Sequence, residues 1–154
     1  MTDDPLRPPE AELRTSGGKP LYSVNGILIA TFCGSLAAGI LLVYLNYVNL
    51  GYNKLAKLTL RWGVAGYMLI IALSTLVPAE PAYLGLIMIL QLGLAGFAAQ
   101  VLQGAAINYH REHRGTIHSP VRAAGLGFLT GIVLFFVSVF LVVVLLSVTG
   151  TPTT

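Results

Sequence analysis

Charged residues are scarce in this chain, and their scarcity excludes a water-soluble fold. Only 10% of the 154 residues are charged, against about 25% in soluble domains. Hydrophobic residues make up 55% of the chain, and its mean hydropathy is +0.78. Helices so uniformly apolar have no polar face for water, which excludes a soluble bundle or a coiled coil. The predicted fold class is all-α, an integral membrane bundle of four transmembrane helices.

Residues and motifs typical of catalytic, metal or cofactor sites are also few. Cys33 is the only cysteine, so no intramolecular disulfide and no cysteine-rich metal site can form. The sequence contains no Gly-x-Ser-x-Gly, no phosphate loop and no dinucleotide fingerprint. Ser74 and Thr75 lie in apolar sequence without an acid or base nearby. We therefore expect a protein that is not an enzyme and has no cofactor.

The composition changes along the chain and indicates one folded unit. Residues 1–20 are rich in proline, glycine and charge, and we expect them to form a disordered polar tail. Residues 21–150 form the predicted transmembrane domain, and residues 151–154 a second short tail. The apolar runs predict helices at about 26–48, 62–78, 82–107 and 123–148, and residues 51–61 predict a short basic surface helix.

The basic residues predict an orientation. They favour contact with the lipid bilayer and not with nucleic acid, because they flank apolar runs. Three cations in the tail, Arg7, Arg14 and Lys19, favour a cytoplasmic N-terminus and so oppose the orientation that the loop cations predict. Membrane proteins carry an excess of such residues in cytoplasmic loops, so we expect the two basic loops in the cytoplasm and both termini outside it. The loop cations are Lys54, Lys57, Arg61, Arg111, Arg114 and Arg122.

Two ridges of small residues predict the tightest helix contacts, because small side chains let helix backbones approach closely in lipid. The interpretations left open are packing within one chain, a homo-oligomer and a membrane-protein partner. The ridges are Ala30, Gly34 and Ala38 in the first helix, and Ala123, Gly127 and Gly131 in the fourth.

Three glutamines interrupt the third apolar run, and an amide in hydrocarbon needs a hydrogen-bond partner. They are Gln91, Gln100 and Gln103. Interhelical hydrogen bonding is one interpretation, and a polar lining for a small solute is the other. No ionisable residue lies in the predicted core of any helix, which argues against a proton-coupled transporter built from one chain.

The third connection contains histidines that resemble a metal site only in part. His110 and His113 are three residues apart and are interleaved with Arg111 and Arg114, whose charge repels a cation. Zinc proteases place their histidines four apart with a glutamate beside the first. We expect a surface loop without metal, with His110 and His113 as the weak candidates and with pH-dependent contact to anionic lipid as a hypothesis.

Several short motifs run through the predicted four-helix region: Leu21-Tyr22-Ser23, Asn25, Ile27, Ala30-Thr31-Phe32, Gly34, Ala37-Ala38-Gly39, Asn46-Tyr47, Leu102-Gln103-Gly104 and Ala124-Gly125-Leu126-Gly127. Together they resemble a family of small bacterial inner-membrane proteins to which no activity is attached. The resemblance does not cover the tail, and it implies the topology and a bacterial source without a catalytic residue.

The sequence favours a non-enzymatic, multi-pass inner-membrane protein that acts through protein–protein interaction, as an accessory, assembly or protective subunit. The alternative is a small transporter or channel subunit that forms a polar path as an oligomer, with the three glutamines as lining.

Overall fold

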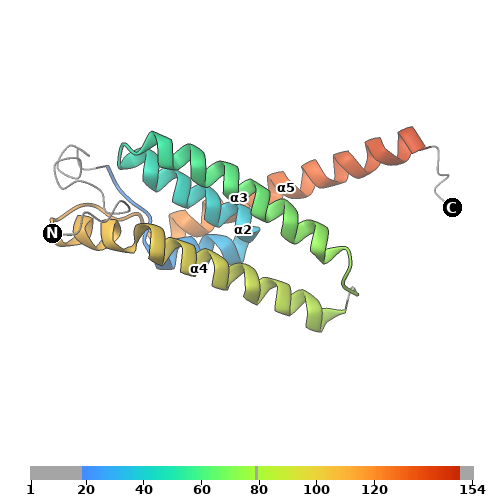
Figure 1. Ribbon diagram of the computed structural model, residues 1–154, viewed down its shortest axis with the longest axis horizontal. Helices are drawn as coiled ribbons and strands as arrows, with labels where there is room; N and C mark the ends of the chain where they lie inside the picture. The colour runs from blue at the N-terminus through green and yellow to red at the C-terminus, as the bar shows by residue number, and fades with distance from the viewer. Residues whose placement is uncertain (1–18, 79, 150–154) are drawn as a thin grey trace.

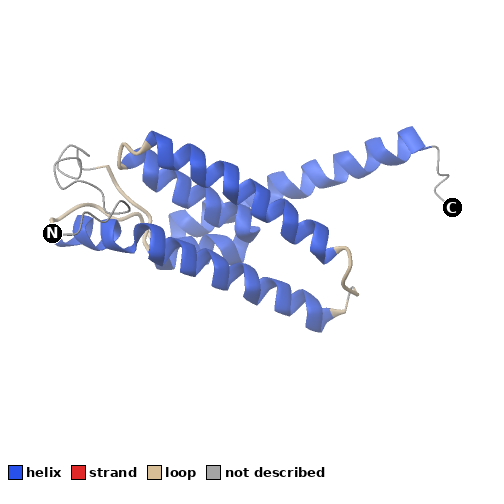
Figure 2. Ribbon diagram, in the orientation of Figure 1, coloured by secondary structure: helices blue, strands red, loops and turns tan. Residues whose placement is uncertain are grey.

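The computed structural model describes residues 19–78 and 80–149. These residues form four long α-helices, α2 (Val24–Asn49), α3 (Asn53–Ser74), α4 (Pro81–Glu112) and α5 (Pro120–Thr149) (Figures 1 and 2). Each contains a stretch that is long and apolar enough to cross a membrane. The all-α prediction of four long apolar helices is confirmed. The two predicted tails lie outside the described residues, apart from Lys19 and Pro20.

Three helices extend further at their basic ends than the sequence analysis predicts. Helix α5 does so by three residues, since it begins at Pro120. The basic segment that was expected to form a separate surface helix is instead the first part of α3, which begins at Asn53. The third helix continues past 107 to Glu112. A basic residue near a helix end can keep its charged group among the headgroups, because its long side chain reaches there from the helix. The basic turns can therefore belong to the membrane-spanning helices.

Helix α2 is the centre of the bundle. It packs against α3, α4 and α5, whereas those three helices scarcely contact one another. Burial follows the same pattern: more than half of the apolar stretch of α2 is buried, against about a tenth or less in each of the other three. The position of α2 therefore determines how the whole molecule is held together.

The chain of α2 reverses direction halfway along. Gly34 (φ −137°, ψ 17°) and Ser35 (φ 73°, ψ 177°) leave the helical conformation. The backbone N–H of Tyr22, just before the helix, donates to Asn46 Oδ1 near its end at 2.7 Å, although a straight helix would separate these residues by roughly 36 Å. Residues 24–33 and 36–49 are thus the two arms of a helical hairpin, whose blue and cyan ribbons lie together in Figure 1.

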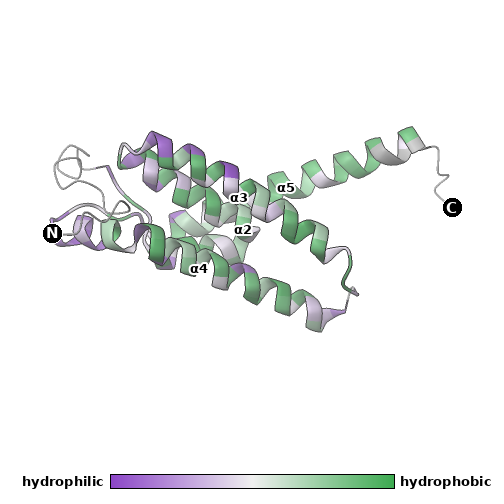
Figure 3. Cartoon of the chain, viewed as in Figure 1, coloured by the Kyte–Doolittle hydropathy of each residue, from purple (hydrophilic) through white to green (hydrophobic). Residues whose placement is uncertain are grey.

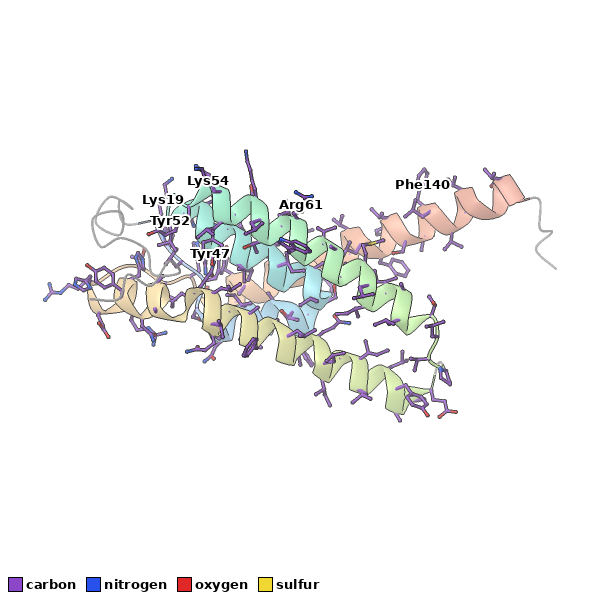
Figure 4. All side chains as sticks on the ribbon, in the orientation of Figure 1. Lys19, Tyr47, Tyr52, Lys54, Arg61 and Phe140 are labelled. Atoms are coloured by element: carbon purple, nitrogen blue, oxygen red, sulfur yellow. The ribbon has the colours of Figure 1, made fainter. Side chains whose placement is uncertain are left out.

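Because of the hairpin, the segment before α2 lies at the same end of the bundle as two of the helix connections. The open end of the hairpin lies at the same end of the bundle as the α2–α3 and α4–α5 connections, whereas α5 ends at the opposite end (Figure 1). The carbonyl of Pro20 accepts from Asn49 Nδ2 at 2.9 Å, and Figure 4 shows Lys19, Tyr52 and Lys54 at this end of the molecule. The described segment that enters α2 therefore lies at the same end of the bundle as the α2–α3 and α4–α5 connections. A straight first helix would place this segment at the opposite end.

The two ends of the bundle differ in the polarity of their residues. The hydrophilic colouring gathers at the end where the hairpin opens, and the remaining helix lengths are mostly hydrophobic (Figure 3). Seven cations lie at or near this end with exposed side chains: Lys19, Lys54, Lys57, Arg61, Arg111, Arg114 and Arg122.

Candidate functional site

The turn of the hairpin contacts α3, α4 and α5, and the first two supply polar groups to it. The backbone N–H of Leu36 has no helical partner after the break, and it donates to Gln91 Oε1 on α4 at 2.9 Å. The Ser35 hydroxyl donates to the Tyr67 hydroxyl on α3 over 3.4 Å. An unpaired N–H in an apolar environment is costly, so Gln91 is the side chain that allows the helix to break here.

Small residues bring the first arm of the hairpin against α5. A methyl group on Gly127 would lie 2.5 Å from the carbonyl oxygen of Ala30, and one on Gly34 would overlap the carbonyl oxygen of Gly127. A methyl group on Gly131 would lie 3.3 Å from the Cα of Gly34. The structure therefore brings these members of the two predicted ridges together within one chain.

The remaining two ridge residues lie on either side of this contact. Ala123 is fully buried near Gly26 at the start of α2. Ala38 is buried too, but it belongs to the second arm of the hairpin and so does not continue the line of Ala30 and Gly34. Gly39, its neighbour, approaches Thr31 across the hairpin so closely that a methyl group would overlap the threonine hydroxyl.

A buried pair of amides closes the open end of the hairpin. Asn46 accepts from the N–H of Tyr22 and donates both to the Tyr22 carbonyl at 2.8 Å and to Gln103 Oε1 at 2.9 Å. Gln103 in turn donates to the carbonyl of Val43 at 2.8 Å. Asn46 is 0% exposed and Gln103 1%. This network ties the segment that enters α2 and the second arm of the hairpin to α4.

The segment before α2 is also held by the α4–α5 connection. The N–H of Leu21 donates to the Thr116 carbonyl at 3.1 Å, and the N–H of His118 donates to the Leu21 carbonyl at 2.8 Å. The rings of Tyr22 and His118 lie 4.4 Å apart. Burial, and then the positive charge of Arg122, lower the pKa of His118. The connection therefore favours a neutral histidine.

The three glutamines have different roles. Gln91 and Gln103 use their amides in hydrogen bonds within the chain. Gln100 is exposed, and its amide lies over Gly104 one turn further along α4. The three side chains do not line a common space, which removes much of the basis for a glutamine-lined path through one copy of the chain.

The histidine loop contains no assembled metal site among the described residues. His110 Nε2 lies 3.2 Å from the Thr116 carbonyl, and His113 Nδ1 lies 2.9 Å from the Tyr109 carbonyl. The His113 ring also stacks on Tyr109 at 3.9 Å. No group of three or more potential ligands lies together within residues 19–78 and 80–149. Both histidines instead hold the local shape of the loop.

Asn46 and the hairpin turn are the features that sequence reasoning missed. Asn46-Tyr47 appears in the sequence analysis only as a motif of the family resemblance, and no spacing in the sequence pairs Asn46 with Tyr22. A Gly-Ser pair within a long apolar run is the signal that was available for the turn. Comparison with known protein families, with curated proteins and with solved structures gives no match to this chain.

Proposed function

We propose that this chain is a non-enzymatic, multi-pass protein of the bacterial inner membrane that acts by binding other membrane proteins, as an accessory, assembly or protective subunit. Its interaction surface is the part of α5 that extends beyond the tip of the hairpin. The observation that carries the proposal is the difference between the two halves of α5.

The first half of α5 has an intramolecular partner and the second half has none among the described elements. Gly127 and Gly131 pack on the hairpin. From Ile132 to Val144, every side chain except the half-buried Leu134 is exposed, and this part of α5 extends away from α3 and α4 (Figure 1). The cause is geometric, because the first arm of the hairpin is only roughly 15 Å long at 1.5 Å per residue.

The boundary between the two halves is hollowed. A space of about 340 Å³ lies next to the hairpin tip, bordered by Cys33 and by the α5 residues Phe128, Gly131, Ile132, Phe135 and Phe136. Apolar packing and small residues drive helix association in lipid. A transmembrane helix of a partner that continued the line of the hairpin would fill this space and cover the free half of α5.

We place the open end of the hairpin in the cytoplasm. The seven exposed cations near that end support this orientation through the positive-inside rule. The hairpin then enters and leaves the membrane from the cytoplasmic side, so α2, which is long enough for the first of four crossings, would lie in the membrane without crossing it. Helices α3, α4 and α5 cross the membrane in this proposal, and α5 ends outside. In this orientation the three cations of the N-terminal tail no longer conflict with those of the loops.

Photo-crosslinking along α5 in native membranes tests the proposal. A photoreactive residue at Phe135 or Phe140, both of which are exposed, should give one defined crosslinked protein other than the chain itself. The matched control is Leu69 on α3, which is 59% exposed and should give only lipid adducts. Equal crosslinking from all three positions, or none from α5, would refute the proposed surface.

A second candidate function is a subunit of a transporter or channel, and the hairpin is the observation that favours it. Discontinuous helices with ends near the membrane midplane often line ion and solute sites. Cys33 is exposed at the hairpin tip and reports on water there. A membrane-impermeant maleimide should leave Cys33 unlabelled in intact membranes if the chain is an interaction subunit, and should label it if a water-filled path reaches the turn.

A further inference from the structure

One face of α4 points away from the bundle and carries a regular pattern. Six residues follow one another at alternating intervals of four and three, the spacing of the two core positions of a helical heptad. They are Leu86, Leu90, Gly93, Phe97, Gln100 and Gly104, which we call the α4 seam. The seam is roughly 27 Å long at 1.5 Å per residue, close to the roughly 30 Å of a bilayer core.

The seam lacks a partner within the described chain. Leu86 is 62% exposed and Phe97 70%, and the space around Gly93 is open to 4 Å. Gly104 is the exception, because it is buried and the side chain of Gln100 from its own helix lies over it. The opposite face of α4, with Ala95, Ala99 and Gln103, is the one that packs on the hairpin.

Gln100 makes contact between this face and lipid unfavourable in free energy. Tyr83 and Tyr109 mark the two ends of α4, and tyrosines favour the interfaces. Halfway between them is residue 96, so Gln100 lies roughly 6 Å from the centre of the bilayer. No hydrogen bond involves its side chain within residues 19–78 and 80–149, and an unpaired amide at that depth is unfavourable.

We propose that α4 binds α4 of a second copy of this chain, as a parallel two-fold dimer joined at Gln100. An amide carries both a donor and an acceptor, so two symmetry-related glutamines can satisfy each other across the axis. Gly93 leaves room for a facing side chain, and Leu90 and Phe97 fill the layers on either side of it. The proposal rests on the proposed function, since it adds a self-association surface to a chain that acts by binding membrane proteins.

Cysteine crosslinking in lipid tests this seam. In full-length chain carrying Cys33→Ala, single cysteines at Leu90 or Phe97 should form disulfide-linked dimers in liposomes of phosphatidylcholine and phosphatidylglycerol. Leu84 and Leu102 are matched controls, because they are 57% and 49% exposed on the other side of α4. Crosslinking at Leu102 as efficient as that at Phe97 would overturn the proposal.

The amide is tested separately by the dimer equilibrium. Gln100→Leu should weaken dimerisation in the same liposomes roughly 3- to 20-fold, the range expected from interhelical hydrogen bonds, and Gln100→Asn should retain part of the affinity. A chain that stays monomeric at every protein-to-lipid ratio, or a Gln100→Leu variant that dimerises like the unchanged chain, would contradict the inference. A monomer that still crosslinks to another protein through Phe140 would leave the proposed function standing without the dimer.

Discussion

At the scale of single residues, buried amides hold together parts of the chain that are distant in sequence. Asn46 is fully buried and bonds to the backbone of Tyr22 and to the side chain of Gln103. Gln91 provides the acceptor for the N–H of Leu36. Removing one partner of a buried hydrogen bond leaves the other without water or protein to bind, which costs more than the bond itself contributes.

Asn46→Leu should therefore lower the free energy of unfolding by about 2–4 kcal/mol, because it leaves the N–H and the carbonyl of Tyr22 and the oxygen of Gln103 without this partner. Unfolding by sodium dodecyl sulfate in mixed micelles measures the loss. Asn25→Leu is the control, since Asn25 is exposed on the same helix and its replacement should change stability by about 0.5 kcal/mol or less. Equal losses in the two variants would contradict the role of the network.

The His118 contact predicts a pH dependence. Its pKa is lowered in the folded chain, so the folded state favours the neutral ring over the protonated one. The attachment of Leu21 to the α4–α5 connection is complete above the ordinary histidine pKa of about 6.5 and weakens as the pH falls below it.

Hydrogen exchange corrected for the intrinsic rate measures this effect. Protection of the Leu21 and His118 amides should fall between about pH 7 and pH 5, while that of Ala99 inside α4 should not. His118→Phe keeps an aromatic ring beside Tyr22 and should remove the pH dependence. The same fall in the variant would show that another group is responsible.

At the scale of elements, the hairpin depends on one unusual conformation and one close contact. Ser35 has φ 73° and ψ 177°, a region that is nearly restricted to glycine because of its Cβ. Gly34 and Gly127 then allow backbone to touch backbone where the first arm meets α5. The turn therefore combines strain at one residue with close packing at its neighbours.

Ser35→Gly should stabilise the chain by about 1–2 kcal/mol, because glycine adopts this conformation without strain. The lost hydroxyl contact to Tyr67 is long, at 3.4 Å, and offsets little of the gain. Ser35→Ala separates the two terms, since it removes the hydroxyl and keeps the strain. A Ser35→Gly variant less stable than Ser35→Ala would mean that the backbone at this position is not strained.

Gly127→Ala should destabilise the chain by about 1–3 kcal/mol, because the added methyl group meets the backbone of Ala30, which cannot move aside as a side chain would. Gly125→Ala is the matched control two residues away in the same helix, with open space around it. It should be neutral or stabilising, since alanine favours a helix over glycine by about 1 kcal/mol. Similar effects of the two substitutions would contradict the close contact.

At the scale of the whole molecule, the sequence predicts the number and type of the long helices well, and it predicts the path of the chain between them poorly. Four apolar helices follow directly from the scarcity of charge. The reversal of α2 does not, because an apolar run of this length suits one crossing as well as a hairpin. The turn is stabilised by Gln91, which lies 55 residues along the chain from Leu36, and no local spacing indicates such a contact.

The placement of the candidate site residues shows the same limit. Regular spacing was enough to select Gly34, Gly127 and Gly131, because helix packing in lipid depends on residue size along one face. The environments of Gln91, Gln100 and Gln103 differ, although all three are glutamines on α4. Which amide is buried, which supports a turn and which is exposed depends on where α2 folds back.

The reversal of α2 is the central claim, and a distance between its two ends tests it most directly. Spin labels at Asn25 and Val48 in lipid nanodiscs, measured by double electron–electron resonance, should show a distance below about 20 Å, since packed helices lie roughly 8–10 Å apart. A continuous helix would hold these positions roughly 35 Å apart at 1.5 Å per residue. A single distribution at the longer distance would contradict the hairpin and the orientation proposed from it.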